Sequence, residues 1–221
     1  MIKTGAILAV LAIALGLGPM VRTEGPRIEM VPVTVNGKIL HVGTYEVSVA
    51  QWRDCVGDGA CDDIMKQVLN PRLMPATGLN WFDTHDFVKW YNAKHDQAVR
   101  LPSAAEWAAI NGPRPKTETK LLFDDPRLAW AATYGQMKSP GGPVRARGAW
   151  SEPRNGIHDL DGNVWEWTAS CIDGADPAKC PAAHVVGAHD TLLSVFVREP
   201  ASGGCSSGAP PTHVGFRLVE D

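Results

Sequence analysis

The sequence lacks any long run of charge. Its 221 residues carry 21 Lys and Arg against 24 Asp and Glu, a net charge of -3, so the charge pattern gives no support for nucleic-acid binding. It also lacks internal repeats, low-complexity tracts and a clear interdomain linker. After the first 24 residues, no segment is apolar enough to span a membrane. These absences favour a single folded domain over residues 27–221 and set nucleic acid aside as a partner.

The N-terminal segment 1–24 has the pattern of an export signal. Lys3 supplies a positive charge, and the apolar stretch "AILAVLAIALGLG" has the length of a signal-peptide core. It is short for a membrane-spanning helix, which needs roughly 20 apolar residues. Because Pro19 follows Gly18 and no A-x-A motif is present, an uncleaved anchor or a buried helix remain alternatives. We expect a periplasmic or secreted protein that touches a membrane only if this anchor is retained.

Five cysteines in an exported chain are typical of disulfide bonds. Cys55 and Cys61 flank the short loop "VGDGA", and Cys171 and Cys180 flank "IDGADPAK". We predict these two disulfides and a free Cys205, which lies in "SGGCSSG". Zinc binding is the alternative. It is disfavoured because neither pair has C-x-x-C spacing and no two histidines are placed to complete a site.

Glycine and proline are abundant, with 22 and 17 residues, which indicates many turns and little regular structure. The hydrophobic fraction of 44% is sufficient for a packed core. The sequence pattern predicts helices near 48–56 and 83–92. Ser103 and Glu106 form a capping box that predicts the start of a third helix. The end of the chain, "HVGFRLVED", alternates as a β-strand does.

The segment 155–170, "NGIHDLDGNVWEWTAS", combines acidic side chains with glycines and two tryptophans. The indoles indicate a buried segment, and a buried carboxylate needs a positive partner because burying it unpaired costs several kcal/mol. We therefore expect a cation beside this segment. An EF-hand is excluded because its sixth position is Val164 rather than glycine and its twelfth is Ser170 rather than glutamate.

Five sequence blocks follow one another in a recognisable order: "GTYEVSVAQW", "GLNWFDTHDFVKWYN", "VRLPSAAEWAAI", "GIHDLDGNVWEW" and "HVGFRLV". Together they resemble the formylglycine-generating enzyme, or sulfatase-modifying factor, family over roughly Gly43 to Val219. "LPSAAEW" and "GNVWEW" are the specific blocks. The resemblance implies an α+β domain with a C-type-lectin-like fold and a low content of regular secondary structure. That expectation agrees with the abundance of glycine and proline.

The resemblance also implies a structural calcium ion in the acidic segment. Hard divalent cations bind carboxylate and carbonyl oxygens. Carried over from the family, the side-chain ligands are Asp159 and Glu166, and the carbonyl ligands belong to Gly162 and Val164. The alternative is that the two carboxylates only accept hydrogen bonds from backbone amides. A second calcium ion, which family members often bind in the preceding loop, is not expected because "YGQMKSPGGPVRARGAW" has no carboxylate.

The family's enzymes oxidise a sulfatase cysteine to formylglycine with oxygen and copper(I), an ion that suits a pair of thiolates. The corresponding stretch here, "VVGAHDTLLSVFVREPASGGCSSG", contains only Cys205. We therefore do not expect copper, and Cys205 is a weak catalytic candidate. Relatives without the cysteine pair include periplasmic pyoverdine-maturation proteins and the ergothioneine sulfoxide synthases, whose iron is held by histidines of an extra N-terminal domain. His184 and His189 are interpreted as solvated loop residues.

Two classes of function follow from these observations. The first is a maturation factor that acts on an exported protein, peptide or small molecule. The second is a non-catalytic, calcium-stabilised binding module on a lectin-like scaffold. The fold does not decide between them, because one scaffold can carry many sites.

Overall fold

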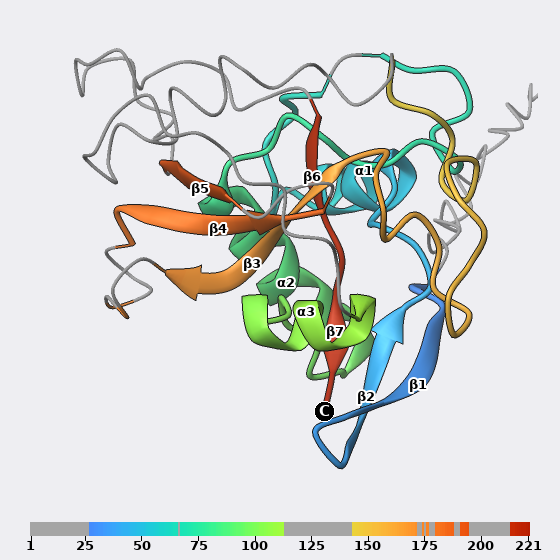
Figure 1. Cartoon of the computed structure of the whole chain (residues 1–221). Helices are drawn as coiled ribbons and strands as arrows, with labels where there is room; N and C mark the ends of the chain where they lie inside the picture. Colours follow the sequence, from blue (N-terminus) through green and yellow to red (C-terminus); the bar gives the residue numbers. More distant parts are fainter. Residues whose placement is uncertain are drawn as a thin grey trace, which may run out of the picture.

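The computed structural model describes residues 27–65, 67–112, 143–171, 174, 176, 180–187, 191–194 and 213–221. The predicted signal or anchor, Cys205 and His189 lie outside these residues. Within them the chain forms three helices and two small sheets joined by irregular segments (Figure 1). This is the predicted α+β class with little regular structure. In the same residues, no helix has the length and apolar character needed to cross a membrane.

The first sheet is built on a β-hairpin. β1 (Met30–Val35) and β2 (Lys38–Gly43) pair antiparallel. The turn residues Asn36 and Gly37 have φ of 49° and 80°, the positive values that a two-residue type I′ turn requires. β7 (Val219–Glu220) pairs with the other edge of β2, so the end of the chain completes this sheet.

The second sheet has the strand order β5-β4-β3-β6. Its strands, in chain order, are β3 (Trp165–Cys171), β4 (Ala182–Val186), β5 (Thr191–Ser194) and β6 (Val214–Phe216). β3 pairs antiparallel with β4 and parallel with β6. Only residues 217 and 218 separate β6 from β7, so the chain passes directly from the second sheet into the first (Figure 1).

The C-terminal strand prediction is wrong in its details. The expected single alternating strand is two short strands, β6 and β7, that belong to different sheets. Every residue from Val214 to Val219 is buried. The reason is that this stretch runs between the two sheets and has packing partners on both sides, so no face is left for alternating polar residues.

Each of the three helices starts with a reciprocal capping box. In such a box the side chain of the N-cap residue and that of the third helical residue each accept the other's backbone N–H. The helices and their capping pairs are α1 (Val49–Gly57) with Ser48 and Gln51, α2 (Trp81–His95) with Asn80 and Asp83, and α3 (Ala104–Asn111) with Ser103 and Glu106.

The predicted helices are confirmed, with differences at their ends. α1 begins within one residue of the expected position. α2 extends beyond the predicted range 83–92 at both ends, because Asn80 and Asp83 cap it further upstream. The predicted capping box of Ser103 and Glu106 is confirmed, with hydrogen bonds of 3.1 Å and 2.8 Å. A capping box can be predicted from the sequence because its two residues are only three positions apart.

Tryptophans supply much of the core. Five of them are at most 2% exposed: Trp52, Trp81, Trp107, Trp165 and Trp167. A buried indole still needs an acceptor for its N–H. The N–H of Trp81 donates to the carbonyl of Thr168 at 2.7 Å, and that of Trp167 donates to the carbonyl of Leu79 at 2.9 Å. These two bonds tie β3 to the start of α2 from both sides.

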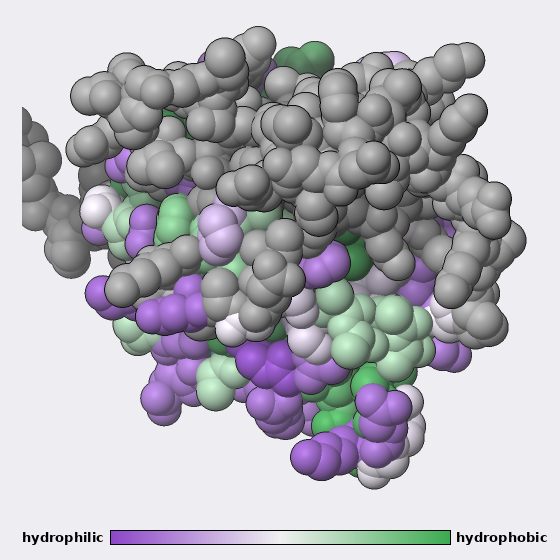
Figure 2. Space-filling model, turned by 60° about the vertical axis from the view of Figure 1, so that its left-hand side comes forward, coloured by the Kyte–Doolittle hydropathy of each residue, from purple (hydrophilic) through white to green (hydrophobic). Residues whose placement is uncertain are grey.

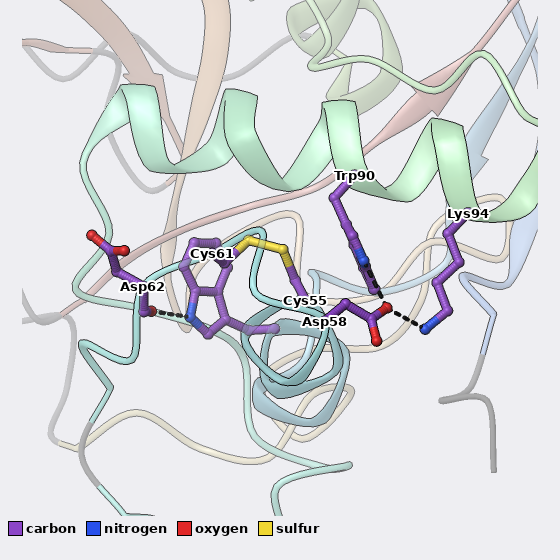
Figure 3. Close-up of a disulfide and its surroundings, with 7 residues drawn as sticks. Cys55, Asp58, Cys61, Asp62, Trp90 and Lys94 are labelled. Atoms are coloured by element: carbon purple, nitrogen blue, oxygen red, sulfur yellow. Dashed lines mark hydrogen bonds and ion pairs between the residues drawn. A yellow bond between two sulfur atoms is a disulfide. The ribbon is translucent and has the colours of Figure 1, made fainter. Parts of the chain in front are cut away.

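Both predicted disulfides are present. Cys55 and Cys61 are bonded, with their Cα atoms 5.3 Å apart, and Cys171 and Cys180 are bonded, with their Cα atoms 5.7 Å apart. The first bond closes the loop after α1, which is also held by side chains of α2 (Figure 3). Asp58 of this loop accepts a hydrogen bond from the indole of Trp90 at 3.0 Å. The loop is therefore fastened by covalent and by polar contacts.

Hydrophilic and hydrophobic residues are intermixed over the described part of the face shown in Figure 2. Within the described residues, the large hydrophobic residues that are exposed are Ile39, Ile64, Leu69 and Leu73. Three of these four lie in the irregular segment between α1 and α2.

Candidate functional site, a buried charged cluster

The acidic segment leads into β3 where the two sheets meet. Asp159 and Asn163 have φ of 59° and 67°, the left-handed conformation that Asp and Asn adopt more readily than most residues. The side-chain oxygen of Asn163 accepts the N–H of Arg145 at 2.9 Å, and its amide donates to the Arg145 carbonyl at 3.3 Å. The segment is thus fixed to the preceding loop, residues 145–151.

Asp159 is held by backbone amides. Its carboxylate is 1% exposed and accepts three N–H groups, from Gly148 at 2.5 Å, Trp150 at 3.0 Å and Ser151 at 3.3 Å. These three backbone N–H groups supply the carboxylate with hydrogen bonds without any metal ion. The contacts of Asp159 therefore match the alternative to metal binding, in which the carboxylate accepts hydrogen bonds from backbone amides.

Glu166, also 1% exposed, has a cationic partner from the C-terminal end of the chain. Nη2 of Arg217 lies 2.8 Å from Oε1 of Glu166, and Nε of Arg217 lies 3.1 Å from Oε2. The indole N–H of Trp107 donates to Oε2 at 3.0 Å. The cation expected beside this segment is present in the chain itself, as the guanidinium of Arg217.

Arg217 directs its guanidinium at several acceptors besides Glu166. Nη1 donates to the carbonyls of Gly43 at 2.8 Å and Thr44 at 3.0 Å, and Nη2 donates to the carbonyl of His158 at 2.8 Å. Burial opposes the charge, but Glu166 and Glu46 favour it, so the pKa of Arg217 lies above its usual value. The residue joins the end of β2, the acidic segment and the link between β6 and β7.

Glu46 is a second buried carboxyl in this cluster. It is completely buried, and within the described residues neither of its carboxyl oxygens has a hydrogen-bond partner. Burial raises its pKa to about 8; the charge of Arg217 opposes this rise, and the charges of Glu166 and Asp159 add to it. Glu46 therefore carries a proton at neutral pH, which removes one negative charge from the cluster.

In the part of the chain that the structure describes, three further buried polar atoms without a hydrogen-bond partner lie on residues of the same region. They are Oγ1 of Thr44, Nε of Arg147 and Nδ1 of His158. His158 stacks on Tyr45 with ring centroids 4.6 Å apart, and the Nη1 group of Arg147 donates to the carbonyl of Glu46 at 2.7 Å. An interior of this kind is polar enough to hold ordered water.

Three of the four predicted calcium ligands, Asp159, Glu166 and Gly162, have N–H partners for their oxygens. Asp159 and Glu166 accept the donors described above, and the carbonyl of Gly162 accepts the N–H of Val164 at 2.9 Å. Calcium takes six to eight oxygen ligands, whereas these oxygens point at donors of the protein. In the described residues, no group of three or more His, Cys, Asp or Glu side chains is arranged to hold a metal. The contacts of these residues therefore do not fit calcium.

Sequence reasoning missed Glu46 and Arg217. A signal existed for Arg217, because it stands in the apolar run "VGFRLV", where a charge needs a buried partner. Glu46 gave a weaker signal, since "YEVSV" also suits a strand with one exposed face. The remaining acidic residue of the segment, Asp161, forms an ion pair with Arg154 near the surface and does not enter the cluster.

The remaining candidates from the sequence are Cys205, His184 and His189, and the structure describes only His184. Cys205 and His189 lie outside the described residues. His184, expected in a solvated loop, lies instead in β4, half-buried, and its carbonyl accepts the hydroxyl of Thr168 at 2.9 Å. The loop interpretation of His184 is wrong because "HVVGAH" begins inside a strand, and the β-branched valines favour that conformation.

The sequence model of the sulfatase-modifying factor enzyme 1-like domain matches residues 12–221. The chain therefore belongs to this family, as its sequence blocks indicate. The match covers the two sheets, the three helices and the buried charged cluster. The fold is accordingly that of formylglycine-generating-enzyme-like proteins.

Solved structures show the same fold at low sequence identity. Variable protein 1 of Treponema denticola superposes with a TM-score of 0.51 and 17% identity, covering 88% of this chain and 93% of its own. PvdO from Pseudomonas aeruginosa superposes with a TM-score of 0.53 and 18% identity, covering 84% of this chain and 81% of its own. At such identities the likeness concerns the fold alone.

Proposed function

We propose that the chain is an exported maturation factor, a sulfatase-modifying-factor-like protein that acts on an exported protein, peptide or small molecule. The observation that carries the export part is the pair of disulfides, Cys55–Cys61 and Cys171–Cys180. Disulfides persist in oxidising compartments and are rare in the cytosol. The export-signal pattern of residues 1–24 supports the same compartment.

The cysteine count argues against the copper oxidase reaction of the family. The chain has five cysteines, and the two disulfides use four of them. Only Cys205 is left, whereas copper(I) in this reaction is expected to need two thiolates. The proposal is therefore a maturation step that does not pass through a two-cysteine copper site.

The buried charged cluster supports a structural role rather than a substrate site. Glu46, Asp159, Glu166 and Arg217 are all at most 1% exposed, so a substrate does not reach them without local opening. Catalytic groups normally line a concave surface that a substrate can enter. The chemistry of the maturation step therefore belongs to residues outside this cluster.

Gene deletion with matched complementation tests the proposal. In the native host, exported proteins and metabolites are compared by mass spectrometry between the parent strain and the deletion strain. We expect a precursor to accumulate, and we expect the full-length chain to restore its product. A chain lacking residues 1–24 is the matched control and should fail to restore it. If the truncated chain restores the product fully from the cytosol, the export part of the proposal is wrong; if the deletion changes no exported species, the maturation role is wrong.

A further inference from the structure

Arg217 lies in a ligand environment that resembles that of a bound metal ion. Its guanidinium is surrounded by three main-chain carbonyls and one carboxylate, contributed by Gly43, Thr44, His158 and Glu166. Hard divalent cations select this mixture of carbonyl and carboxylate oxygens. The guanidinium differs from such an ion in being planar and covalently attached, with N–H groups that fix the direction of each contact.

We propose that Arg217 is the resident cation of the acidic segment: its guanidinium supplies the positive charge that a calcium ion would supply, so the native fold closes this segment without a divalent metal. The proposal concerns the stability of the domain and is independent of the maturation role. It explains why the expected ligand Glu166 is occupied by N–H donors of Arg217 in this chain.

The charges of the cluster are consistent with one cation. Glu166 is paired with Arg217, and Asp159 is stabilised by three backbone amides. Within the described residues, the carboxyl oxygens of Glu46 have no hydrogen-bond partner, and this carboxyl lies close enough to Arg217, Glu166 and Asp159 to interact with their charges. A calcium ion placed beside Glu166 would meet the guanidinium at short range, and like charges in a buried site repel strongly.

The hydrogen bonds of Arg217 explain how one side chain can hold the acidic segment to both sheets. Its acceptors come from the end of β2, from the acidic segment and from β3, and Arg217 itself follows β6. These parts of the chain are far apart in sequence, with separations of 174 residues to Gly43 and 59 residues to His158. A single guanidinium thus crosslinks both sheets through the acidic segment.

The first test measures calcium binding by the purified full-length protein. Its melting temperature is recorded in calcium and in EDTA, and calcium is titrated by calorimetry. A ligand that binds only the native state raises the melting temperature as its concentration exceeds its dissociation constant. We expect identical melting curves and no stoichiometric binding. Stoichiometric calcium binding that disappears in Glu166→Gln overturns the proposal.

The second test removes the guanidinium. In Arg217→Gln the carboxylates lose their cation, so we expect a lower melting temperature that calcium partly restores. Arg100→Gln is the matched control: Arg100 pairs with Glu106 and Asp221 at the surface, and its loss should create no response to calcium. If Arg217→Gln does not fold alone, the refolding yield with and without calcium gives the same readout. If calcium restores neither the melting temperature nor the refolding yield of Arg217→Gln, Arg217 is only the partner of an ordinary ion pair. The proposal that its guanidinium takes the place of a calcium ion is then wrong.

Discussion

Arg217 and Glu166 form an ion pair at 2.8 Å in which both side chains are 1% exposed, although 51 residues separate them in the chain. Such a pair gains little over well-packed apolar residues, because both ions lose their hydration. Removing one partner is different, since the other charge is then left buried without compensation. The pair is therefore a sensitive point of the fold.

We predict that Glu166→Gln destabilises the protein by about 3–5 kcal/mol, the usual loss when one partner of a buried pair is removed. The amide of glutamine still accepts the indole N–H of Trp107, so the loss reports mainly on Arg217. The measurement is the free energy of unfolding from denaturant titration at neutral pH.

The control for this variant is Glu106→Gln. Glu106 also pairs with an arginine, Arg100, at 2.8 Å, but the two side chains are 25% and 35% exposed. Exposed pairs contribute about 0–1 kcal/mol, and glutamine retains the capping function of Glu106. A loss in Glu166→Gln no larger than that of the control would show that the buried pair is not a sensitive point.

The contrast between these two pairs shows what the sequence predicts well. The capping box of Ser103 and Glu106 could be predicted because its partners are three residues apart. Glu166 and Arg217 come together through the parallel pairing of β3 with β6. The local sequence around either residue does not indicate its partner. The residues around Glu166 thus indicated a cation, and the family resemblance implied that this cation is calcium.

Glu46 makes the stability of the protein depend on pH. Its pKa is 4.5 in the unfolded chain and about 8 in the native state, because burial disfavours the ionised carboxyl. The native state therefore holds a proton that the unfolded state releases across this range. It follows that the contribution of Glu46 to stability is fully present below about pH 4.5 and is lost as the pH rises through about 8.

We predict that Glu46→Gln removes this loss. Glutamine resembles the protonated carboxyl in shape but does not ionise, so the variant should gain stability relative to the parent as the pH rises from about 6 to 9. Denaturant titrations of both proteins at several pH values in this range measure the difference. A difference that does not change with pH would show that Glu46 is already ionised in the native state.

The disulfides give a further prediction. Closing the Cys55–Cys61 loop, with a separation of 6 residues, and the Cys171–Cys180 loop, with a separation of 9, should stabilise the protein by about 2–3 kcal/mol each through the entropy of the unfolded chain. Cys55→Ser/Cys61→Ser and Cys171→Ser/Cys180→Ser are compared with the parent in denaturant titrations. Non-reducing peptide mapping should recover both pairs, and a crosslink from Cys205 to any of the four would contradict the assignment.

The last prediction concerns the oxidase reaction itself. A cysteine that binds copper(I) or acts as a nucleophile needs its thiolate form, which nearby positive charge or a metal must favour. Cys205 has only glycine and serine as close sequence neighbours in "SGGCSSG", and the other four cysteines are bonded in pairs. We therefore predict that the protein forms no formylglycine on a peptide with the sulfatase motif Cys-x-Pro-x-Arg, even when copper(I) and oxygen are supplied. Mass spectrometry of the peptide after incubation detects the aldehyde, and a known formylglycine-generating enzyme serves as the positive control. An aldehyde product that is lost in Cys205→Ala would restore the oxidase function, with Cys205 as its catalytic thiol.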